Sequence, residues 1–350
     1  MIPSQVNYCF LLILTLIQFS CNEKKETPNN PLVSKFYDFE ELIGKDYLID
    51  DQHSYLGFKI KYFGYSPVRG RFNEFDGTVF YDTSNITSLS TTLFIDIKSI
   101  NTGNDRRDND LKSEGTWFDV AHYPYAIFRS RQVVKLENGG FELVGDLTIK
   151  DSTKAVAFKF EKPTRISRDW AKNEQIDFEG TAIINRQDFG VYGGDFWSSI
   201  MENGLTQLSD EVELELNIHC RRADYFARYE DMDSTDIRKL ILEEIQVNGF
   251  DKGMEMILES YSKEEVSLSG LSTIGYTLNT WKMHADAIEI FNLKMQLGGE
   301  SKVVFNQLAV SHLSAGNNTL AKEFFLKSLE IDSVNSRSSE YLRLMNSSRN

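Results

Sequence analysis

The sequence predicts an all-β antiparallel barrel, or a stack of two sheets, followed by an all-α helical array. Between residues 46 and 222 apolar and polar residues alternate, which gives each strand one apolar and one polar face. After Cys220 the apolar period lengthens to between three and four residues, as in helices. An open sheet would leave its apolar face and both edges in water, so the strands must close on themselves or pack on a second sheet.

Length and composition fit an ordinary protein of two folded units. The chain has 350 residues, of which 41% are hydrophobic. Its formal net charge is −14. Nucleic-acid binding needs clustered Lys and Arg to contact phosphates, so we expect no nucleic-acid partner.

The N-terminus predicts an export signal. Its apolar stretch, residues 8–19, is too short to span about 30 Å of hydrocarbon but suits the core of a signal peptide. Cys21 follows Ser20 and precedes a polar linker, which resembles the lipobox of bacterial lipoproteins, whose cysteine is acylated after cleavage. This predicts a lipoprotein signal over residues 1–21, a linker over 22–45 and a membrane anchor at Cys21. Plain secretion, with Cys21 as a bystander, is the alternative.

An anchor at Cys21 implies a place in the bacterial cell envelope, attached to the outer membrane on its periplasmic side or at the cell surface. Cys9 would be removed with the signal, which leaves Cys220 without a partner. We therefore expect no structural disulfide, although the protein is predicted to be exported.

The strands can be placed by their alternation. They are expected around residues 57–62, 89–97, 141–149, 156–160, 178–184 and 212–220. Gly145 and Gly180 fall on the inward face. Glycine there leaves room for a ligand close to the backbone, or marks a bulge or tight bend, and the sequence does not choose between these.

Short motifs occur in a fixed order across about half the chain. They are Asp50 to Ser54, Val68 to Phe72, Phe75 to Gly77, Ser99 to Gly103 with Arg107-Asp108, Trp117 to Asp119, Gly145 to Ile149, and Asn185 to Gly190. In this order and at these spacings they resemble the YceI-like family of exported bacterial lipid-binding proteins.

The resemblance implies a lipocalin-like antiparallel barrel of about eight strands over residues 46–222, whose bore holds one polyisoprenoid chain such as a quinone or prenyl-phosphate tail. A closed sheet of about eight strands is just wide enough for its own side chains plus one slender ligand. The bore should therefore be narrow and deep.

Candidate ligand-lining residues follow from strand parity, with one aromatic residue added from a loop. A packed core without ligand would use the same residue types, so the set matters more than any member. They are Phe58, Ile60, Tyr62, Leu93, Ile95, Phe128, Leu143, Leu147, Phe158, Phe160, Phe178, Ala182, Leu214, Leu216 and Trp117.

The segment from Asn101 to Pro124 is long and charged and carries Trp117 and Phe118. The resemblance makes it an omega-like insertion near one end of the barrel. Aromatic residues on a mobile loop suit a lid, so ligand entry here is a hypothesis.

Polar residues in the motifs do not predict an enzyme. Asp50, His53 and the Arg107-Asp108 and Arg186-Asp188 pairs could be mistaken for an acid-base site. The two Arg-Asp pairs are better explained as ion pairs or turn caps that pin loops to the barrel rim. No Gly-x-Ser-x-Gly, His-Glu-x-x-His, Walker or paired-cysteine motif occurs. We therefore expect neither catalysis nor a metal or cofactor.

The helical part, residues 235–345, carries a 34-residue period like that of tetratricopeptide repeats. A degenerate unit precedes two clearer ones, so about six helices and a capping tail over 336–344 are expected. The packing positions of the two clearer units are Ile274, Gly275, Leu278, Ala287, Phe291 and Lys294, then Leu308, Ala309, His312, Ala321, Phe325 and Ser328.

Such an array commonly binds a protein or peptide on its concave face, but one this short could also be a purely structural appendage of the barrel. Two functions therefore stand. One is a membrane-anchored lipid-binding protein with a helical interaction domain. The other is an envelope scaffold whose barrel is packed solid and whose repeats bind the partner.

Overall fold

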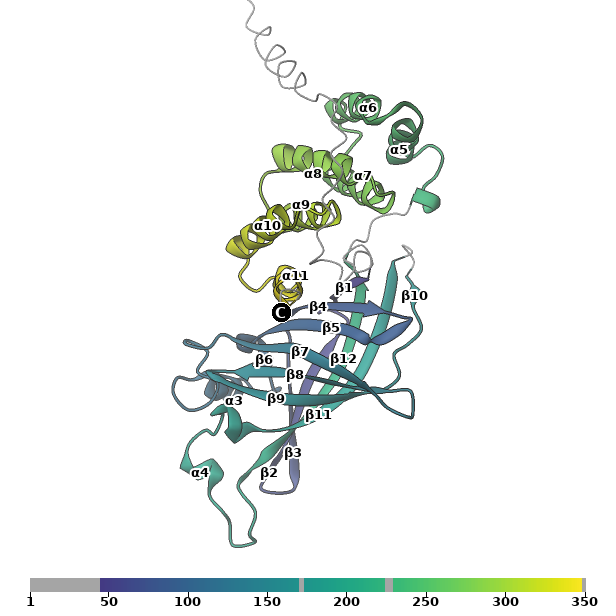
Figure 1. Cartoon of the computed structure of the whole chain (residues 1–350). Helices are drawn as coiled ribbons and strands as arrows, with labels where there is room; N and C mark the ends of the chain where they lie inside the picture. Colours follow the sequence, from purple (N-terminus) through teal and green to yellow (C-terminus); the bar gives the residue numbers. More distant parts are fainter. Residues whose placement is uncertain (1–44, 170–172, 224–228, 348–350) are drawn as a thin grey trace, which may run out of the picture.

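The computed structural model describes residues 45–169, 173–223 and 229–347 (Figure 1). The predicted signal peptide, Cys21 and all but the last residue of the predicted linker lie outside these ranges. Within them, every helix is too short or too polar to cross a membrane.

The alternating region forms one antiparallel sheet, because each strand has an apolar face to bury. Its strands are β1 (Asp46–Ile49), β2 (Tyr55–Tyr62), β3 (Ser66–Phe72), β4 (Phe75–Asp82), β5 (Asn85–Asp96), β6 (Ile100–Asn101), β7 (Tyr125–Lys135), β8 (Phe141–Ile149), β9 (Ser152–Phe160), β10 (Ser167–Arg168), β11 (Glu174–Asn185) and β12 (Leu208–Arg222).

Eight of these strands close into a ring, in the order β1-β4-β5-β7-β8-β9-β11-β12. The short strand β1 completes the ring, because Tyr47 pairs with Val79 of β4 on one side and with Arg222 of β12 on the other. The predicted barrel is therefore confirmed, and a stack of two separate sheets is excluded.

The wall is interrupted at the opposite end of the barrel. There β12 pairs with β2, β2 with β3, and β3 with β6, and β6 is the last strand in this direction. The chain from β6 to β7 was expected to be a mobile loop, but it contains the helix α3 (Asp105–Lys112). The Asn104 side chain caps α3 by accepting a hydrogen bond from the Arg107 amide at 3.0 Å. A shorter helix, α4 (Asp195–Ser198), precedes β12.

Residues 229–347, the described C-terminal part, contain the six expected helices in succession. The expected capping tail forms a seventh helix, and this helix covers part of the barrel, which the sequence did not predict. The helices are α5 (Ile237–Asn248), α6 (Phe250–Ser262), α7 (Leu268–Thr280), α8 (His284–Gly298), α9 (Lys302–Ser314), α10 (Asn318–Ile331) and α11 (Ser336–Ser347). Helices α7 and α9 begin 34 residues apart, at Leu268 and Lys302, and α8 and α10 likewise, at His284 and Asn318. The tetratricopeptide assignment itself stays a prediction.

Helix α11 packs on the outer face of β4 and β5 (Figure 1). Tyr341 of α11 lies edge-on against Phe80 of β4, with 4.9 Å between ring centroids, and both side chains are buried. The barrel face beneath α11 is also polar. Thr92 donates a hydrogen bond to Glu340 at 2.6 Å, and the hydroxyls of Thr78 and Ser336 lie 2.7 Å apart.

An ion pair is buried in this interface. The guanidinium of Arg337 in α11 contacts the Asp46 carboxylate of β1 at 2.6 Å, and Asp46 is only 1% exposed. Burial alone would lower the pKa of Arg337, but the charges of Asp46, Tyr276 and Tyr341 together raise this pKa well above its usual value. Arg337 therefore stays charged, and the pair connects the closing strand of the barrel to the last helix.

We expect Arg337→Met to destabilise the protein by about 3–5 kcal/mol, because it leaves the Asp46 carboxylate buried without its counter-charge. Lys302→Met is a matched control that removes Lys302 from its more exposed contact with Asp332, and it should cost about 0–1 kcal/mol. Urea unfolding followed by circular dichroism measures both. Equal effects of the two substitutions would contradict the structural importance of the buried pair.

Candidate functional site

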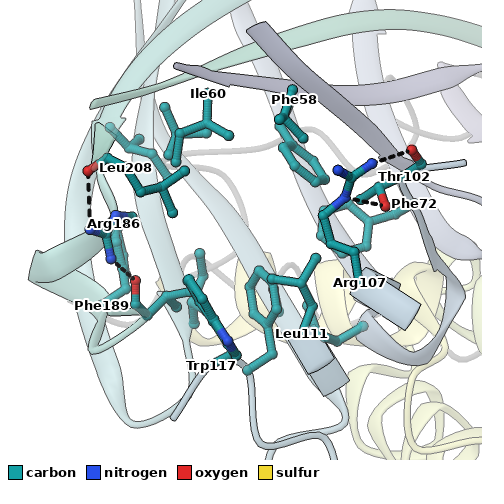
Figure 2. A pocket seen from close by; sticks show the side chains of 18 of the residues that line it. Phe58, Ile60, Phe72, Thr102, Arg107, Leu111, Trp117, Arg186, Phe189 and Leu208 are labelled. Atoms are coloured by element: carbon teal, nitrogen blue, oxygen red, sulfur yellow. Dashed lines mark hydrogen bonds between the residues drawn. The ribbon is translucent and has the colours of Figure 1, made fainter. Parts of the chain in front are cut away.

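The barrel encloses a large cavity at the end where the wall is interrupted (Figure 2). Its volume is about 610 Å³, within the usual range of small-molecule binding sites. Most of the residues around it are apolar. They come from β2, β3, β5, β7, β8, β11 and β12, from the turn after β5, and from the segments between β6 and β7 and between β11 and β12. The cavity has the composition of a site for an apolar ligand.

Seven of the predicted lining residues border this cavity. They are Phe58, Ile60, Tyr62, Ile95, Leu147, Leu214 and Trp117. Their convergence follows from strand parity, because Phe58, Ile60 and Tyr62 alternate along β2 and all face inward. Leu147 of β8 and Leu214 of β12 reach the same space from other parts of the wall.

A second, smaller cavity of about 100 Å³ lies further along the bore and shares Phe72, Ile95, Leu147 and Leu214 with the first. It is bordered by most of the remaining predicted residues, namely Leu93, Phe128, Leu143, Phe158, Phe160, Phe178 and Leu216. Ala182 is buried but borders neither cavity. The bore is thus wide at one end and narrow further in, rather than uniformly narrow.

Aromatic packing narrows the inner part of the bore. The rings of Phe141 and Phe160 stack with 5.0 Å between centroids, and the Phe178 ring lies edge-on to both. Tyr81 adds an edge contact to Phe178 at 5.5 Å. The rings of these side chains occupy the space that a ligand reaching this far along the bore would need.

The inward glycines serve this packing. A Cβ added to Gly145 would lie 2.5 Å from the ring of Phe128, and one added to Gly180 would lie 2.5 Å from the ring of Phe160. The first expectation, that these glycines leave room for a ligand, is therefore wrong for both. In each case an aromatic ring of a neighbouring strand occupies the space. The other expectation, a bulge, matches the surroundings of Gly145, because β7 has a register irregularity between Ser130 and Gln132 beside it.

The segment after α3 covers the interruption in the wall. Trp117 lies between the strands and α4. Its ring centroid is 6.2 Å from that of Trp197, and the ring centroid of Trp197 is 6.2 Å from that of Tyr62. Gly193 supports Trp117 from outside, because a Cβ there would lie 2.1 Å from the indole ring. The Gly193 amide donates a hydrogen bond to the Thr116 carbonyl at 3.0 Å. Three aromatic rings therefore border the mouth of the cavity.

Arg186 is buried in the wall and fixes the loops of this end (Figure 2). It donates hydrogen bonds to the carbonyls of Val191, Tyr192 and Ser209 at 2.8–3.0 Å and to that of Leu208 at 3.4 Å, and it forms an ion pair with Asp210 at 3.0 Å. Its acidic partner is Asp210, so the predicted pairing with Asp188 is wrong. The predicted role in pinning loops matches this geometry, since the loop after β11 and the start of β12 are joined by one side chain.

Arg107 lies on the other side of the mouth (Figure 2). It donates to the Thr102 hydroxyl at 2.8 Å and to the Thr102 carbonyl at 2.9 Å. Asp108 accepts a hydrogen bond from the Thr102 amide at 2.9 Å, so Arg107 and Asp108 both hold Thr102 rather than each other. Asp110 and Leu111 of α3 complete this side of the cavity.

Several lining residues were missed by the sequence reasoning. Ile149, Ile184 and Val212 continue the inward parity of strands already identified, and Val68 and Phe72 do so on β3, so the same alternation could have found them. Leu111, Phe189, Val191 and Trp197 lie in helices and loops. No periodic pattern marks residues of that second kind.

The described residues include possible metal ligands and one cysteine, the groups that a reactive site could use. In the parts of the chain that the structure covers, no three His, Cys, Asp or Glu side chains are grouped to hold a metal ion. Cys220 is fully buried, and burial raises the pKa of its thiol well above the usual value, which disfavours the reactive thiolate.

A titratable pair lies in the segment that covers the mouth. His122 and Asp119 approach to 2.8 Å between Nδ1 and Oδ1. The hydrogen bond that His122 donates to Asp119, together with the negative charge of Asp119, raises the pKa of His122, and the same hydrogen bond lowers the pKa of Asp119. The pair therefore favours charged His122 in the folded segment.

Known proteins resemble the barrel part of the chain in sequence. A family model described as the YceI-like domain matches residues 47–220. A UPF0312 protein of Vibrio cholerae is 34% identical over 148 residues, which cover 42% of this chain and 77% of that protein. A UPF0312 protein of Pseudomonas aeruginosa is 32% identical over 197 residues, which cover 56% of this chain and 96% of that protein.

Solved structures also resemble the barrel. BcnA from Burkholderia cenocepacia has a TM-score of 0.42 and 23% identity, covering 49% of this chain and 98% of BcnA. A polyisoprenoid binding domain from Saccharophagus degradans has a TM-score of 0.36 and 15% identity, covering 51% of this chain and 99% of that domain.

We expect Gly193→Ala to displace the Trp117 ring and to destabilise the protein by about 1–3 kcal/mol more than Gly103→Ala, because overpacking adds to backbone strain. The two glycines have matched φ values of +73° and +71°, but nothing lies within 4 Å of a Cβ at Gly103. Thermal unfolding and the tryptophan emission spectrum measure the difference. If both variants behave alike, Trp117 is not held by Gly193.

The His122–Asp119 pair predicts a pH dependence of the segment that covers the mouth. With its folded pKa raised, His122 contributes stability that is complete below its unfolded pKa near 6.5 and is lost as the pH rises through the folded value. Asp119, whose folded pKa is lowered, contributes stability above its ordinary pKa of 3.8. This stability is lost as the pH falls through the folded pKa.

Amide hydrogen exchange of residues 119–123, corrected for intrinsic rates, should show more protection at pH 6 than at pH 8. His122→Gln should remove this difference. A difference that survives in the variant would assign the effect to another group.

Proposed function

We propose, from the premise that the chain belongs to the YceI-like family, that its barrel binds a long apolar lipid of the polyisoprenoid type. The observation that carries the proposal is the 610 Å³ cavity with its nearly continuous apolar wall. A slender branched hydrocarbon matches such a wall, because it makes dispersion contacts along its length and needs no hydrogen-bond partner inside.

The energetics favour an apolar occupant. Each square ångström of apolar surface removed from water contributes roughly 25 cal/mol. Cavity walls such as those formed by Phe58, Ile60 and Leu214 would otherwise face solvent. An apolar chain that enters the bore removes its own surface and that of the wall from water together.

The polar part of the lipid would remain at the mouth. Arg107, Asp110 and Thr102 border the cavity on one side of the mouth and Arg186 borders it on the other. Arg186 already contacts five acceptor residues, so the side of Arg107 is the better place for a head group. Trp117, between the two sides, would act as a lid that retains the chain.

Membrane attachment and the helical partner belong to the same proposal. The signal-like N-terminus and Cys21 support an exported lipoprotein of the bacterial envelope, anchored through an acylated cysteine. The helical region would bind a protein or peptide. We further propose that the protein acts by binding alone, since its cavity is apolar and its arginines hold loops.

Lipid extraction tests the proposal. Organic extraction of the purified full-length protein, followed by mass spectrometry, should yield about one polyisoprenoid-type lipid per chain. Ala126→Phe should lower this yield at least tenfold, because Ala126 is buried and borders the cavity, so the added ring fills space the ligand needs.

Ala157→Phe is the matched control, because Ala157 of β9 is exposed on the outside of the barrel. It should leave the lipid yield unchanged. A wild-type extract without lipid, or an equal yield from both variants, would overturn lipid binding in this cavity.

A further inference from the structure

Exposed apolar side chains surround the mouth of the cavity without lining it. We call this set the collar, and it comprises Phe63 and Tyr65 at the tip between β2 and β3, and Phe196, Ile200 and Leu205 between β11 and β12. Tyr65 is 76% exposed, Ile200 74% and Phe196 59%. Apolar surface grouped in this way on a folded protein marks an interaction site more often than scattered single residues do.

The collar is continuous with the cavity wall. Tyr62 borders the cavity whereas its neighbour Phe63 belongs to the collar, and the two rings lie 4.3 Å apart. In the same way, Trp197 borders the cavity and Phe196 belongs to the collar, with 5.0 Å between the rings. A surface that covered the collar would therefore meet the cavity mouth directly.

A hydrogen bond and a packing contact join the two halves of the collar. The Phe63 amide donates to the Gln207 carbonyl at 2.7 Å. Within the second half, the Met201 amide donates to the Leu205 carbonyl at 2.8 Å and shapes the segment between β11 and β12. The Leu205 side chain packs over Gly64, where a Cβ would lie 2.3 Å from it. The collar is thus one shaped surface made from two segments far apart in the sequence.

The backbone at Phe63 has a left-handed conformation that is unfavourable for an aromatic residue. Its φ is +49° and that of Gly64 is +76°, and the Tyr65 amide closes the turn on the Tyr62 carbonyl at 3.2 Å. Turns with positive φ at both central residues favour Asn, Asp or Gly, and an aromatic residue is disfavoured there. The backbone conformation of the turn therefore gives no reason for a phenylalanine at this tip.

We propose that the collar docks on a phospholipid bilayer, so that the lipid ligand passes between bilayer and cavity without crossing water. The proposal rests on the proposed lipid-binding function. Aromatic side chains with apolar bodies favour the membrane interface. The tip from Tyr62 to Pro67 carries no charge, and the segment 192–206 carries only Asp195 and Glu202, so the attraction is apolar rather than electrostatic.

The arrangement of the elements fits this docking. The β2–β3 tip and α4 lie at the end of the molecule away from helices α5 to α10 (Figure 1). A bilayer against the collar would therefore leave the helical region accessible to a partner. The proposed anchor at Cys21 would keep the barrel close to such a surface.

A fluorophore at the collar tests the docking. The full-length protein, reconstituted into phosphatidylcholine vesicles through its own N-terminus, carries an environment-sensitive dye on Ile200→Cys. Val247→Cys on α5, where Val247 is 78% exposed, is the control, and the chain without an added cysteine gives the background. We expect a blue shift at position 200 alone, which persists in about 1 M salt because screening does not weaken apolar contact.

Three results would overturn the docking. Equal emission at positions 200 and 247 would show no bilayer contact. Loss of the blue shift in high salt would show that charge attraction, and not apolar contact, holds the collar at the bilayer. A shift that grows with the number of protein molecules per vesicle would assign the collar to a second copy of the chain.

Phe63→Asn separates docking from folding and from ligand binding. Because Asn suits the turn, this variant should unfold at the same temperature as the wild type or higher, yet reduce the blue shift at position 200 and slow lipid transfer between vesicles several-fold. Ile183→Asn is the control, at an exposed site on β11 outside the collar. It should change neither the blue shift at position 200 nor the rate of lipid transfer. An unchanged transfer rate in Phe63→Asn would contradict the docking.

The lipid extract keeps the two proposals distinguishable. None of the collar residues borders the cavity, so Phe63→Asn should retain the same amount of lipid as the wild type. Lipid in the extract without bilayer contact would overturn the docking alone. An extract without lipid would overturn the lipid-binding function, whatever the dye reports.

Discussion

Closure of the sheet is the constraint on which the rest of the structure depends. β1 has only four residues, yet it pairs with β4 and with β12 and so removes both edges of the ring at one end. The same chain turns at Asp50–Ser54 and continues as β2, whose partners lead to β6 instead of back to β7. One end of the barrel is thus sealed by hydrogen bonds, and the other is covered by α3 and the segment that follows it.

This asymmetry explains where the cavity lies. Where the ring is closed, Phe141, Phe160 and Phe178 fill the bore with one another's rings, and Gly180 on the neighbouring strand β11 makes room for the ring of Phe160. Where the wall is interrupted, the inward side chains face a space that their own volume does not fill. A ligand site arises because close packing is satisfied in one half of the barrel and not in the other.

The helical region is attached to the sealed end. Asp46 of the closing strand is buried against Arg337, and Phe80 of β4 against Tyr341, so residues on the outer face of the barrel form part of an internal interface. This leaves the opposite end, with the cavity mouth and the collar, on the far side from the array. The two parts of the chain therefore divide the surface between them, with the lipid site at one end and the helices at the other.

The sequence by itself determined the strands, their inward faces and the change to helices, because each depends on a local period of hydrophobicity. Phe58, Ile60 and Tyr62 could be placed on the bore by alternation alone. The spacing of 34 residues between α7 and α9 was equally visible.

The tertiary structure alone decided which inward residues border the large cavity and which pack mainly against one another. Parity puts Phe160 and Leu214 on the same inner face, but Leu214 borders the large cavity, whereas Phe160 borders only the small one. It also decided the partners of Arg186 and Asp46, and it brought Phe63 and Phe196 into one collar. These are contacts between residues far apart in the chain, and a local pattern carries no information about where a closed sheet brings its distant segments together.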